Sequence, residues 1–345
     1  MRRKSSKSTF FIMYASRPLG AFFCLLVATL AGCSEKKNAT EKWHPASRDE
    51  ALSATTQSPP KPSPASSTVT GAQGETRFLA YNLKNYLSMR RYTNGAEVYT
   101  SKPNEEIQAL ISIIQSARPD ILGICEIGKD SDLKDLQARL RNAGIDLPHS
   151  HRVHGSDHVR ALAVLSRHPI IATHVPKDLG YTIQGSPFTI SRGILDTTIQ
   201  LPQRKVRFLG VHFKSKRPIK GADQSLMRRN ESLLLRKHID DILTADPNTL
   251  LMAYGDFNDT KRSTAVSSVR GRSNSNLHMK MIELNDSRGE SWTHYWKHED
   301  IYSRIDFIMT NPNLATYISH KDCKLLTPEN WQSASDHRPM LVIIK

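Results

Sequence analysis

Few cysteines, a short apolar segment and the lack of internal repeats each exclude a class of protein. The 345 residues include only four cysteines, and their spacing fits no zinc site, which excludes a zinc-finger protein. The apolar segment from Ala21 to Ala31 is too short to span a bilayer stably. No internal repeat is visible, which excludes a solenoid built from stacked units.

Acidic residues are scarce relative to basic ones. Asp and Glu number 33 against 48 Lys and Arg, so the formal net charge is +15. The excess continues well beyond the N-terminus, in clusters that include Arg90-Arg91, Lys216-Arg217, Arg228-Arg229, Lys261-Arg262 and Arg270 to Arg272. Such a surface attracts polyanions. Nucleic acid and anionic lipid headgroups both qualify, and a merely solvated surface has the same composition, so charge leaves the partner open.

The first residues have the pattern of a signal peptide. Arg2, Arg3 and Lys4 precede the apolar segment. That segment ends in Leu30-Ala31-Gly32-Cys33, which resembles the lipobox of bacterial lipoproteins, where the cysteine is acylated. We therefore expect residues 1–33 to be a lipoprotein signal peptide with Cys33 as the lipidation site. A plain secretory signal and an uncleaved anchor are the alternatives. The expected location is the bacterial cell envelope, lipid-anchored on the outer membrane or another extracytoplasmic face.

Residues 34–74 are expected to form a tether. They are rich in Pro, Ser and Thr and lack apolar periodicity, so they cannot bury enough surface to fold. Residues 75–345 suffice for one large domain with a sizeable core. Cys125 and Cys323, which lie in this domain, are expected to be buried thiols rather than a disulfide. We expect a monomer.

Short apolar runs alternate with helical periodicity in the domain. We predict helices at Asn104 to Ala117, Ser131 to Asn142 and Asp223 to Leu243. Strands are predicted at Arg77 to Tyr81, Ile121 to Glu126, Ala161 to Ser166, Gly193 to Leu201, Val206 to Phe213, Thr249 to Gly255, Arg304 to Met309 and Pro339 to Ile344. Many strands follow one another without a helix between them. The pattern therefore favours an α/β fold, a four-layer sandwich of two mixed, antiparallel-rich sheets flanked by helices.

Polar side chains follow several of these apolar runs, where a sheet would present them to a cleft. They occur in Tyr81-Asn82, Cys125-Glu126, Gly255-Asp256-Phe257-Asn258 and Ser335-Asp336-His337. Mg²⁺ prefers hard oxygen ligands and needs only one or two carboxylates in an open site. The set of residues therefore indicates a magnesium-assisted phosphodiesterase.

The same segments resemble the endonuclease/exonuclease/phosphatase superfamily. Its fold is shared by pancreatic-type deoxyribonucleases, abasic-site endonucleases, neutral sphingomyelinases and inositol polyphosphate phosphatases. The resemblance covers Glu75 to the C-terminus. The matching segments, in family order, are FLAYNLKNY from Phe78, PDILGICEI from Pro119, ALAVLSRHPI from Ala161, LGVHFKSKR from Leu209, AYGDFND from Ala253, SRIDFIM from Ser303 and SDHRPM from Ser335.

This resemblance implies a metal site and a catalytic base. Asn82, Glu126 and Asp336 correspond to metal-site residues that hold Mg²⁺, for which Mn²⁺ can substitute. Asp256 matches the carboxylate that orients and deprotonates the attacking water. Asn258 matches the amide that holds that water or the scissile phosphate. Read alone, Gly-Asp-x-Asn is also a common turn sequence.

The resemblance also implies roles for two histidines. Asp306 would pair with His337 and keep its imidazole charged and aimed at the phosphate. His212 would support phosphate binding or protonation of the leaving group. Alternatively, Asp306 is a buried acid satisfied by Arg304. Lys84 departs from relatives that carry an acid at this position, which argues against a second ligand there.

Basic and aromatic residues near these motifs have two interpretations each. Arg192, Lys214, Lys216 and Arg217 are predicted to bind substrate, with salt bridges or a solvated loop as the alternative. The histidines between His149 and His158 fit a surface loop better than a metal site. The aromatic residues from Trp292 to Trp296 either pack in the core or stack on an exposed base.

The sequence thus predicts a lipid-anchored, Mg²⁺-dependent phosphodiesterase that acts as a nuclease. The first alternative is the same chemistry on a lipid or an inositol phosphate, as in sphingomyelinases. The second is an inactive envelope protein that binds polyanions. The sequence leaves open DNA or RNA as the substrate, endo or exo cutting, and one or two metal ions.

Overall fold

The computed structural model describes residues 74–93 and 95–345. The predicted signal peptide, Cys33 and the tether up to residue 73 lie outside the described residues. Within the described part of the chain, no helix is both long and apolar enough to cross a membrane.

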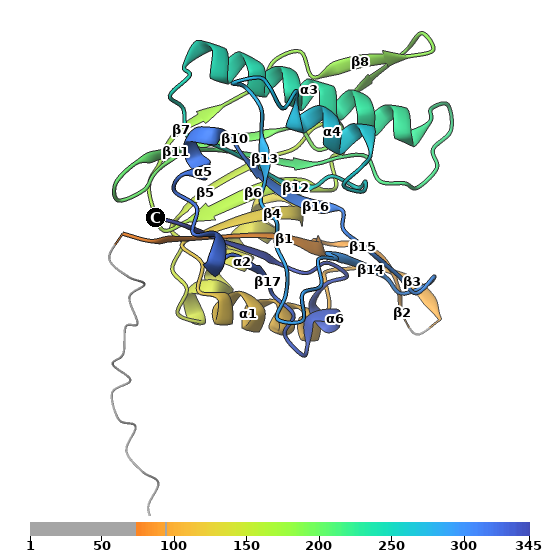
Figure 1. The fold of residues 1–345 in the computed structure, drawn as a ribbon. Coiled ribbons are helices and arrows are strands. Elements are labelled where there is room, and N and C mark those ends of the chain that lie inside the picture. The colour runs from red at the N-terminus through yellow and green to blue at the C-terminus, as the bar shows by residue number, and fades with distance from the viewer. Residues whose placement is uncertain (1–73, 94) are drawn as a thin grey trace, which may run out of the picture. The chain divides into compact units, whose positions relative to one another are not determined.

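Two six-stranded sheets form the centre of the domain (Figure 1). The first sheet has the order β17 (Lys324–Leu325), β18 (Met340–Ile344), β1 (Thr76–Tyr86), β4 (Ile121–Ile127), β6 (Ala161–Ser166), β5 (His149–Val153). The second sheet has the order β13 (Lys280–Met281), β16 (Asp306–Thr310), β12 (Leu251–Asp256), β11 (Lys205–His212), β10 (Leu195–Gln200), β7 (Ile170–His174).

Each sheet has one parallel strand pair at its middle, and its other pairs are antiparallel. In the first sheet β1 and β4 are parallel, with Asn82 opposite Cys125. In the second, β11 and β12 are parallel, with His212 opposite Asp256. Side chains at the carboxyl ends of neighbouring parallel strands meet at one edge of a sheet, the usual place for a ligand site in α/β proteins. The register therefore brings several of the predicted site residues to two such edges.

Helices cover the outer face of each sheet, so the domain has four layers (Figure 1). The helices α1 (Asn104–Ala117) and α2 (Asp130–Asn142) pack on the first sheet. The helices α3 (Gln224–Ala245) and α4 (Thr264–Arg270) pack on the second. Apolar side chains of both sheets, such as Phe78, Phe208 and Tyr254, fill the space between the sheets. The predicted four-layer sandwich is confirmed.

The remaining elements are short. They are the helices α5 (Pro312–Ala315), α6 (Trp331–Ala334) and η1 (His320–Asp322), and the hairpins β2 (Met89–Thr93) with β3 (Ala96–Thr100), β8 (Gly180–Ile183) with β9 (Ser186–Thr189), and β14 (His294–Trp296) with β15 (Ile301–Ser303). None of these hairpins was predicted. The expectation of a loop between His149 and His158 is wrong in part, because His149 to Val153 form β5, which pairs with β6.

Candidate active site

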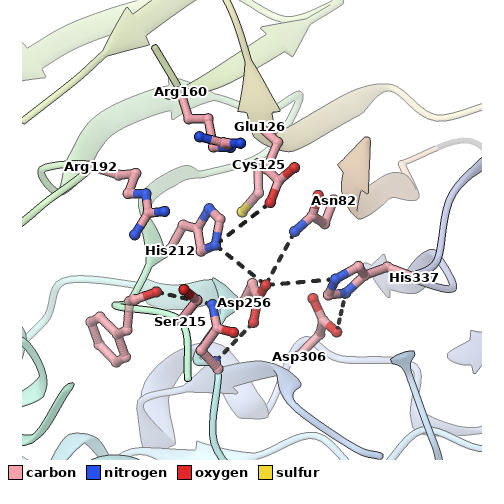
Figure 2. A network of polar contacts seen from close by, with 12 residues as sticks. Asn82, Cys125, Glu126, Arg160, Arg192, His212, Ser215, Asp256, Asp306 and His337 are labelled. Carbon is pink, nitrogen blue, oxygen red and sulfur yellow. Dashed lines mark hydrogen bonds and ion pairs between the residues drawn. The ribbon is translucent and has the colours of Figure 1, made fainter. Parts of the chain in front are cut away.

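The carboxylate of Asp256, at the end of β12, is the point where the two sheets contribute to one site (Figure 2). Its Oδ2 accepts a hydrogen bond of 3.1 Å from Asn82 Nδ2. The same oxygen lies 3.5 Å from His212 Nε2 and 3.7 Å from His337 Nε2. Burial, and then the nearby Asp306 carboxylate, raise the pKa of Asp256 to about 7. A base with such a pKa suits proton transfer near neutral pH.

Backbone geometry at the strand end places this carboxylate. Gly255 has a φ of +137°, and a Cβ there would lie 1.9 Å from the carbonyl oxygen of Val211. Asp256 Oδ1 accepts a 2.8 Å hydrogen bond from the backbone N–H of Asn258, whose own φ is +51°. Asn258 Nδ2 donates to the carbonyl of Phe213 at 3.0 Å. The turn therefore holds Asp256 in place, so in this sequence Gly-Asp-x-Asn serves both as a turn and as part of the site.

His337 is the second centre of the site. Its Nδ1 lies 2.8 Å from Asp306 Oδ2. Burial opposes charge on His337, but the Asp306 carboxylate and this hydrogen bond raise the pKa of His337 to about 10. The ring is therefore an imidazolium at neutral pH. The alternative partner for Asp306 does not hold, because Arg304 forms its ion pair with Glu283 at 2.5 Å.

Asn82, Glu126 and Asp336 lie near Asp256, His212 and His337 respectively. Glu126 has a φ of +65°, and its Oε2 accepts a 2.9 Å hydrogen bond from the N–H of Asn85. Its Oε1 lies 3.9 Å from His212 Nε2, which is longer than a hydrogen bond. Asp336 Oδ1 is 4.0 Å from His337 Nε2. Burial raises the pKa of Asp336, but the charges of His337 and Lys84 outweigh it and lower the pKa below the ordinary value.

These donors fit Mg²⁺ in their chemistry, because two carboxylates and an amide oxygen supply part of an oxygen shell that water completes. Among the described residues, His, Asp and Glu side chains converge within 4.8 Å in two groups, His294 with Asp336 and His337, and Asp256 with Asp306 and His337. Glu126 belongs to neither group. A cation held by Glu126 would supply positive charge to a phosphate oxygen.

Positive side chains lie beyond His212, on the side of Asp256 away from His337 (Figure 2). Arg192 is only 8% exposed, and its Nε has no hydrogen-bond partner, although Asp157 Oδ2 lies 3.4 Å away. Arg160 Nε donates to Asn85 Oδ1 at 2.8 Å. Burial, with the charges of Arg192 and His337, holds the pKa of His212 well below its usual range. His212 is thus a neutral imidazole.

The lysines after His212 have different surroundings. Lys214 is buried, and its Nζ donates to the carbonyl oxygens of Ser215 and Arg217 at 3.2 and 3.1 Å. Its backbone N–H donates to the buried carboxylate of Glu231 at 2.6 Å. Lys216 and Arg217 are exposed. The structure therefore places Lys214 inside the loop that presents the other two.

The sequence from residue 81 to residue 337 matches the family described as the Endonuclease/Exonuclease/phosphatase family. The protein belongs to this family. The matched range begins and ends within the site described above, at Tyr81 beside Asn82 and at His337 itself. Members of the endonuclease/exonuclease/phosphatase family are hydrolases of phosphate esters. No curated protein matches the sequence significantly.

Solved structures share this fold at low sequence identity. A family member from Bacteroides vulgatus is 17% identical, with a TM-score of 0.56, and the match covers 79% of this chain and 98% of that chain. Beta toxin 275-280 from Staphylococcus aureus is 16% identical, with a TM-score of 0.55, covering 78% and 100%. The human Nocturnin catalytic domain with bound sulfate anion is 14% identical, with a TM-score of 0.52, covering 80% and 96%. At these identities the likeness concerns the fold alone.

In the present protein, two further residues belong to the site and were not predicted from the sequence. Thr293 Oγ1 donates to Asp306 Oδ2 at 2.7 Å and accepts from the backbone N–H groups of Ile305 and Asp306. His294 lies with its ring centroid 4.6 Å from that of His337. Burial, then the charge of His337, lower the pKa of His294 to about 4, so it is neutral. Both residues lie in the aromatic segment, where only Trp and Tyr were considered.

Proposed function

We propose that the protein is a Mg²⁺-dependent nuclease that hydrolyses phosphodiester bonds of DNA or RNA. The observation that carries this proposal is that a base, the Asp256 carboxylate, lies beside a positive charge, the His337 imidazolium. The Asp256 carboxylate, with a pKa of about 7, lies 3.7 Å from the Nε2 of the charged His337 imidazole. Phosphodiester hydrolysis needs both, because a water must lose a proton while negative charge builds on the phosphate.

The residues divide the chemistry as follows. Asp256 accepts the proton of the attacking water, and Asn258 orients that water or a phosphate oxygen. His337, held by Asp306 and Thr293, donates a charged hydrogen bond to the phosphate. Such a bond strengthens as charge develops in the transition state, so it lowers the barrier more than it tightens substrate binding. Neutral His212 contacts a phosphate oxygen or the leaving group. Glu126, Asp336 and Asn82 would hold Mg²⁺, or Mn²⁺ in its place, and the bound ion would supply positive charge to the phosphate.

The basic side of the site supports a polymeric substrate. Arg192 and Arg160 lie next to His212 (Figure 2), and Lys216 and Arg217, a few residues after His212 in the sequence, are exposed. A nucleic acid brings several phosphates to such a surface, whereas a lipid headgroup or an inositol phosphate brings at most a few. Arg192, whose Nε lies 3.4 Å from Asp157 Oδ2, adds a positive charge on this side of the site.

We further propose that Cys33 is acylated and that a tether links the anchored cysteine to the catalytic domain, on an extracytoplasmic face of a bacterial envelope membrane. The support is the sequence Leu30-Ala31-Gly32-Cys33 and the proline-rich composition that follows it. The catalytic domain acts as a monomer in this proposal.

A parallel substrate assay tests the function. The full chain is incubated with Mg²⁺ and, separately, with plasmid, RNA, sphingomyelin and inositol phosphates, with and without EDTA. Cleavage of a nucleic acid that EDTA abolishes is the expected result. Hydrolysis of sphingomyelin or inositol phosphates, with nucleic acids left intact, would overturn the proposal in favour of a lipid or inositol phosphate substrate.

A further inference from the structure

The hairpin of β14 and β15 extends directly from the catalytic centre. His294, the first residue of β14, forms an antiparallel bridge with His337. The next backbone N–H, that of Tyr295, donates to the carbonyl of Asp336 at 2.9 Å. The hairpin is thus an extra strand pair beside the catalytic segment. Residues directly opposite each other in such a pair have their side chains on the same face.

This pairing decides which hairpin side chains face the substrate. His294 is opposite His337 on one side and Ser303 on the other, so these three side chains share the catalytic face. Side chains alternate along a strand, so the pair of Trp296 and Ile301 lies on that same face, two residues farther out. Two residues of strand span about 7 Å. Trp296 therefore lies within reach of the nucleotide next to a phosphate at His337.

The opposite face of the hairpin, formed by Tyr295 and Tyr302, packs against the rest of the domain. Tyr295 and Tyr302 stack on each other with ring centroids 4.4 Å apart. Tyr302 also contacts Trp292 at 4.8 Å, and Trp292 contacts Trp331 of α6 at 5.1 Å. These aromatic rings fix the hairpin to the body of the domain. Tyr302 is nevertheless 50% exposed. On the catalytic face, Trp296 and Ile301 are 51% and 47% exposed.

The tip of the hairpin argues against a membrane as the partner of this face. The turn between the strands consists of Lys297, His298, Glu299 and Asp300, which are all exposed. A hairpin that enters a bilayer needs apolar residues at its tip, because charged groups are costly in the hydrocarbon region. Here the charges are at the tip and the exposed aromatic ring is on the flank. A flat ring on the flank of a site suits stacking with a nucleobase.

We propose that Trp296, supported by Ile301, is a stacking platform for an unpaired base adjacent to the scissile phosphate, so that the enzyme prefers single-stranded or locally unpaired nucleic acid. This inference rests on the proposed nuclease function. A base within a duplex is already stacked on its neighbours and cannot stack on Trp296 without leaving them. Stacking depends on the face of the base rather than on its edge, so little sequence preference follows.

The test measures binding of short single-stranded oligonucleotides to the full chain, with Asp256→Asn as the background that prevents cleavage. Fluorescence anisotropy is recorded for Trp296, Trp296→Ala, Trp296→Phe and Trp296→Leu, with oligonucleotides that carry an abasic residue at successive positions. We expect Trp296→Ala and Trp296→Leu to weaken binding about 5- to 100-fold, the scale of one stacked base. Trp296→Phe should recover most of this affinity. One abasic position should remove the difference between Trp296 and Trp296→Ala.

Tyr92→Ala is the matched control, because Tyr92 is 79% exposed on the other hairpin, β2–β3. It should change affinity less than twofold. The inference is overturned if Tyr92→Ala and Trp296→Ala weaken binding equally, or if Trp296→Ala leaves the affinity unchanged. In both cases the protein still binds oligonucleotides, so the nuclease proposal stands. If no single-stranded oligonucleotide binds, the inference fails, and cleavage of plasmid or RNA decides the nuclease proposal separately. A different outcome would identify a membrane contact and overturn the inference. In that outcome Trp296→Leu binds anionic vesicles more tightly than Trp296→Ala but binds oligonucleotides no better.

Discussion

At the scale of single residues, Asp256 and His337 are both buried and lie close together, yet they are ready for opposite tasks. The carboxylate is shifted toward its neutral form, whereas the imidazole is held charged by Asp306. Their surroundings raise both pKa values, so near neutral pH the carboxyl group can exchange a proton while the imidazole stays charged. Asp306 matters to both, because its charge raises the two pKa values together.

Removing either group should impair turnover more than binding. Asp256→Asn removes the base and His337→Ala removes the charged donor, so each should lower kcat on the order of 100-fold or more. Steady-state kinetics on the preferred nucleic acid, with affinity measured separately, checks this. Glu105→Gln, an exposed change in the first turn of α1, serves as the control. A rate near that of the unmodified enzyme in either variant would contradict the assigned roles.

Glu126, which is partly buried, and Glu231, which is buried, should respond differently to loss of their charge. Glu126→Gln keeps the shape but loses the charge, so it should raise the Mg²⁺ concentration needed for half-maximal activity and weaken Mg²⁺ binding in calorimetry. Glu231→Gln should instead lower Tm and leave the Mg²⁺ requirement unchanged, because Glu231 accepts from Ser191 and Lys214 backbone N–H groups. Unchanged Mg²⁺ binding in Glu126→Gln would remove this residue from the metal site.

The sequence alone allows prediction of those site residues that come at the ends of apolar runs. Asn82 and Glu126 come just after the apolar runs inside β1 and β4, and Asp256 is the last residue of β12. The parallel strand pairs bring such positions to one edge of each sheet. Thr293 and His294 do not follow an apolar run, and they reach the site only through pairing of β14 with the segment at His337. That pairing is nonlocal and involves a strand of three residues. No local pattern encodes it.

At the scale of elements, helix α3 is held to the second sheet by a buried carboxylate. Asp196 of β10 is fully buried, and it accepts from Arg207 of β11 at 2.7 and 2.6 Å and lies 2.7 Å from His238 Nε2 of α3. Burial raises the pKa of Asp196, but the His238 and Arg207 contacts outweigh it and lower the pKa below its ordinary value.

Asp196→Ala should therefore destabilise the domain by about 3 kcal/mol, the scale for leaving buried partners unpaired. A carboxylate whose folded pKa is depressed stabilises fully above its unfolded pKa of about 3.9. The difference in the free energy of unfolding between Asp196→Ala and the unmodified protein should therefore shrink as the pH falls through the depressed pKa of Asp196 in the folded state. Urea unfolding at several pH values measures it. Asp241→Ala, which breaks the exposed pair with Lys237 on the same helix, should have no measurable effect.

The sequence predicted the long elements well and missed the short ones. The helix from Asn104 to Ala117 was predicted with its observed bounds, since Glu105 and Glu106 begin it and apolar residues recur on one face, although the N-cap is Pro103 rather than Asn104. The three hairpins were missed because their strands are largely exposed and carry no alternation toward a core. The strand β5 was missed for a related reason, since an edge strand rich in His and Arg has the composition of a loop.

At the scale of the whole molecule, the net charge of +15 should make nucleic acid binding depend strongly on salt. If Lys216 and Arg217 contact phosphates, replacing both with Ala should reduce the slope of log K against log salt by about one unit for each phosphate that is no longer bound. Lys134→Ala with Arg141→Ala, on helix α2, removes the same charge from another surface. Equal changes in slope for the two double variants would show a general charge effect and no local binding of phosphate.

Anchoring can be separated from catalysis. Cys33→Ser should prevent acylation, so the protein should move from the membrane fraction to the soluble one or remain unprocessed, while the activity of the catalytic domain persists. Mass spectrometry of the mature N-terminus and detergent phase partitioning measure this. An unmodified Cys33 in the wild-type protein would exclude the lipoprotein assignment.

The pairing of Thr76 with Ile344 has a consequence for when the enzyme can act. The first sheet lacks an inner strand until β18 has been synthesised, and β18 follows directly after Asp336 and His337. A nascent chain therefore holds Asp256 but neither the imidazolium nor the completed sheet. Contacts so distant in sequence also form slowly. A polypeptide that leaves the cytoplasm before this closure would spare the nucleic acids of the cell that makes it.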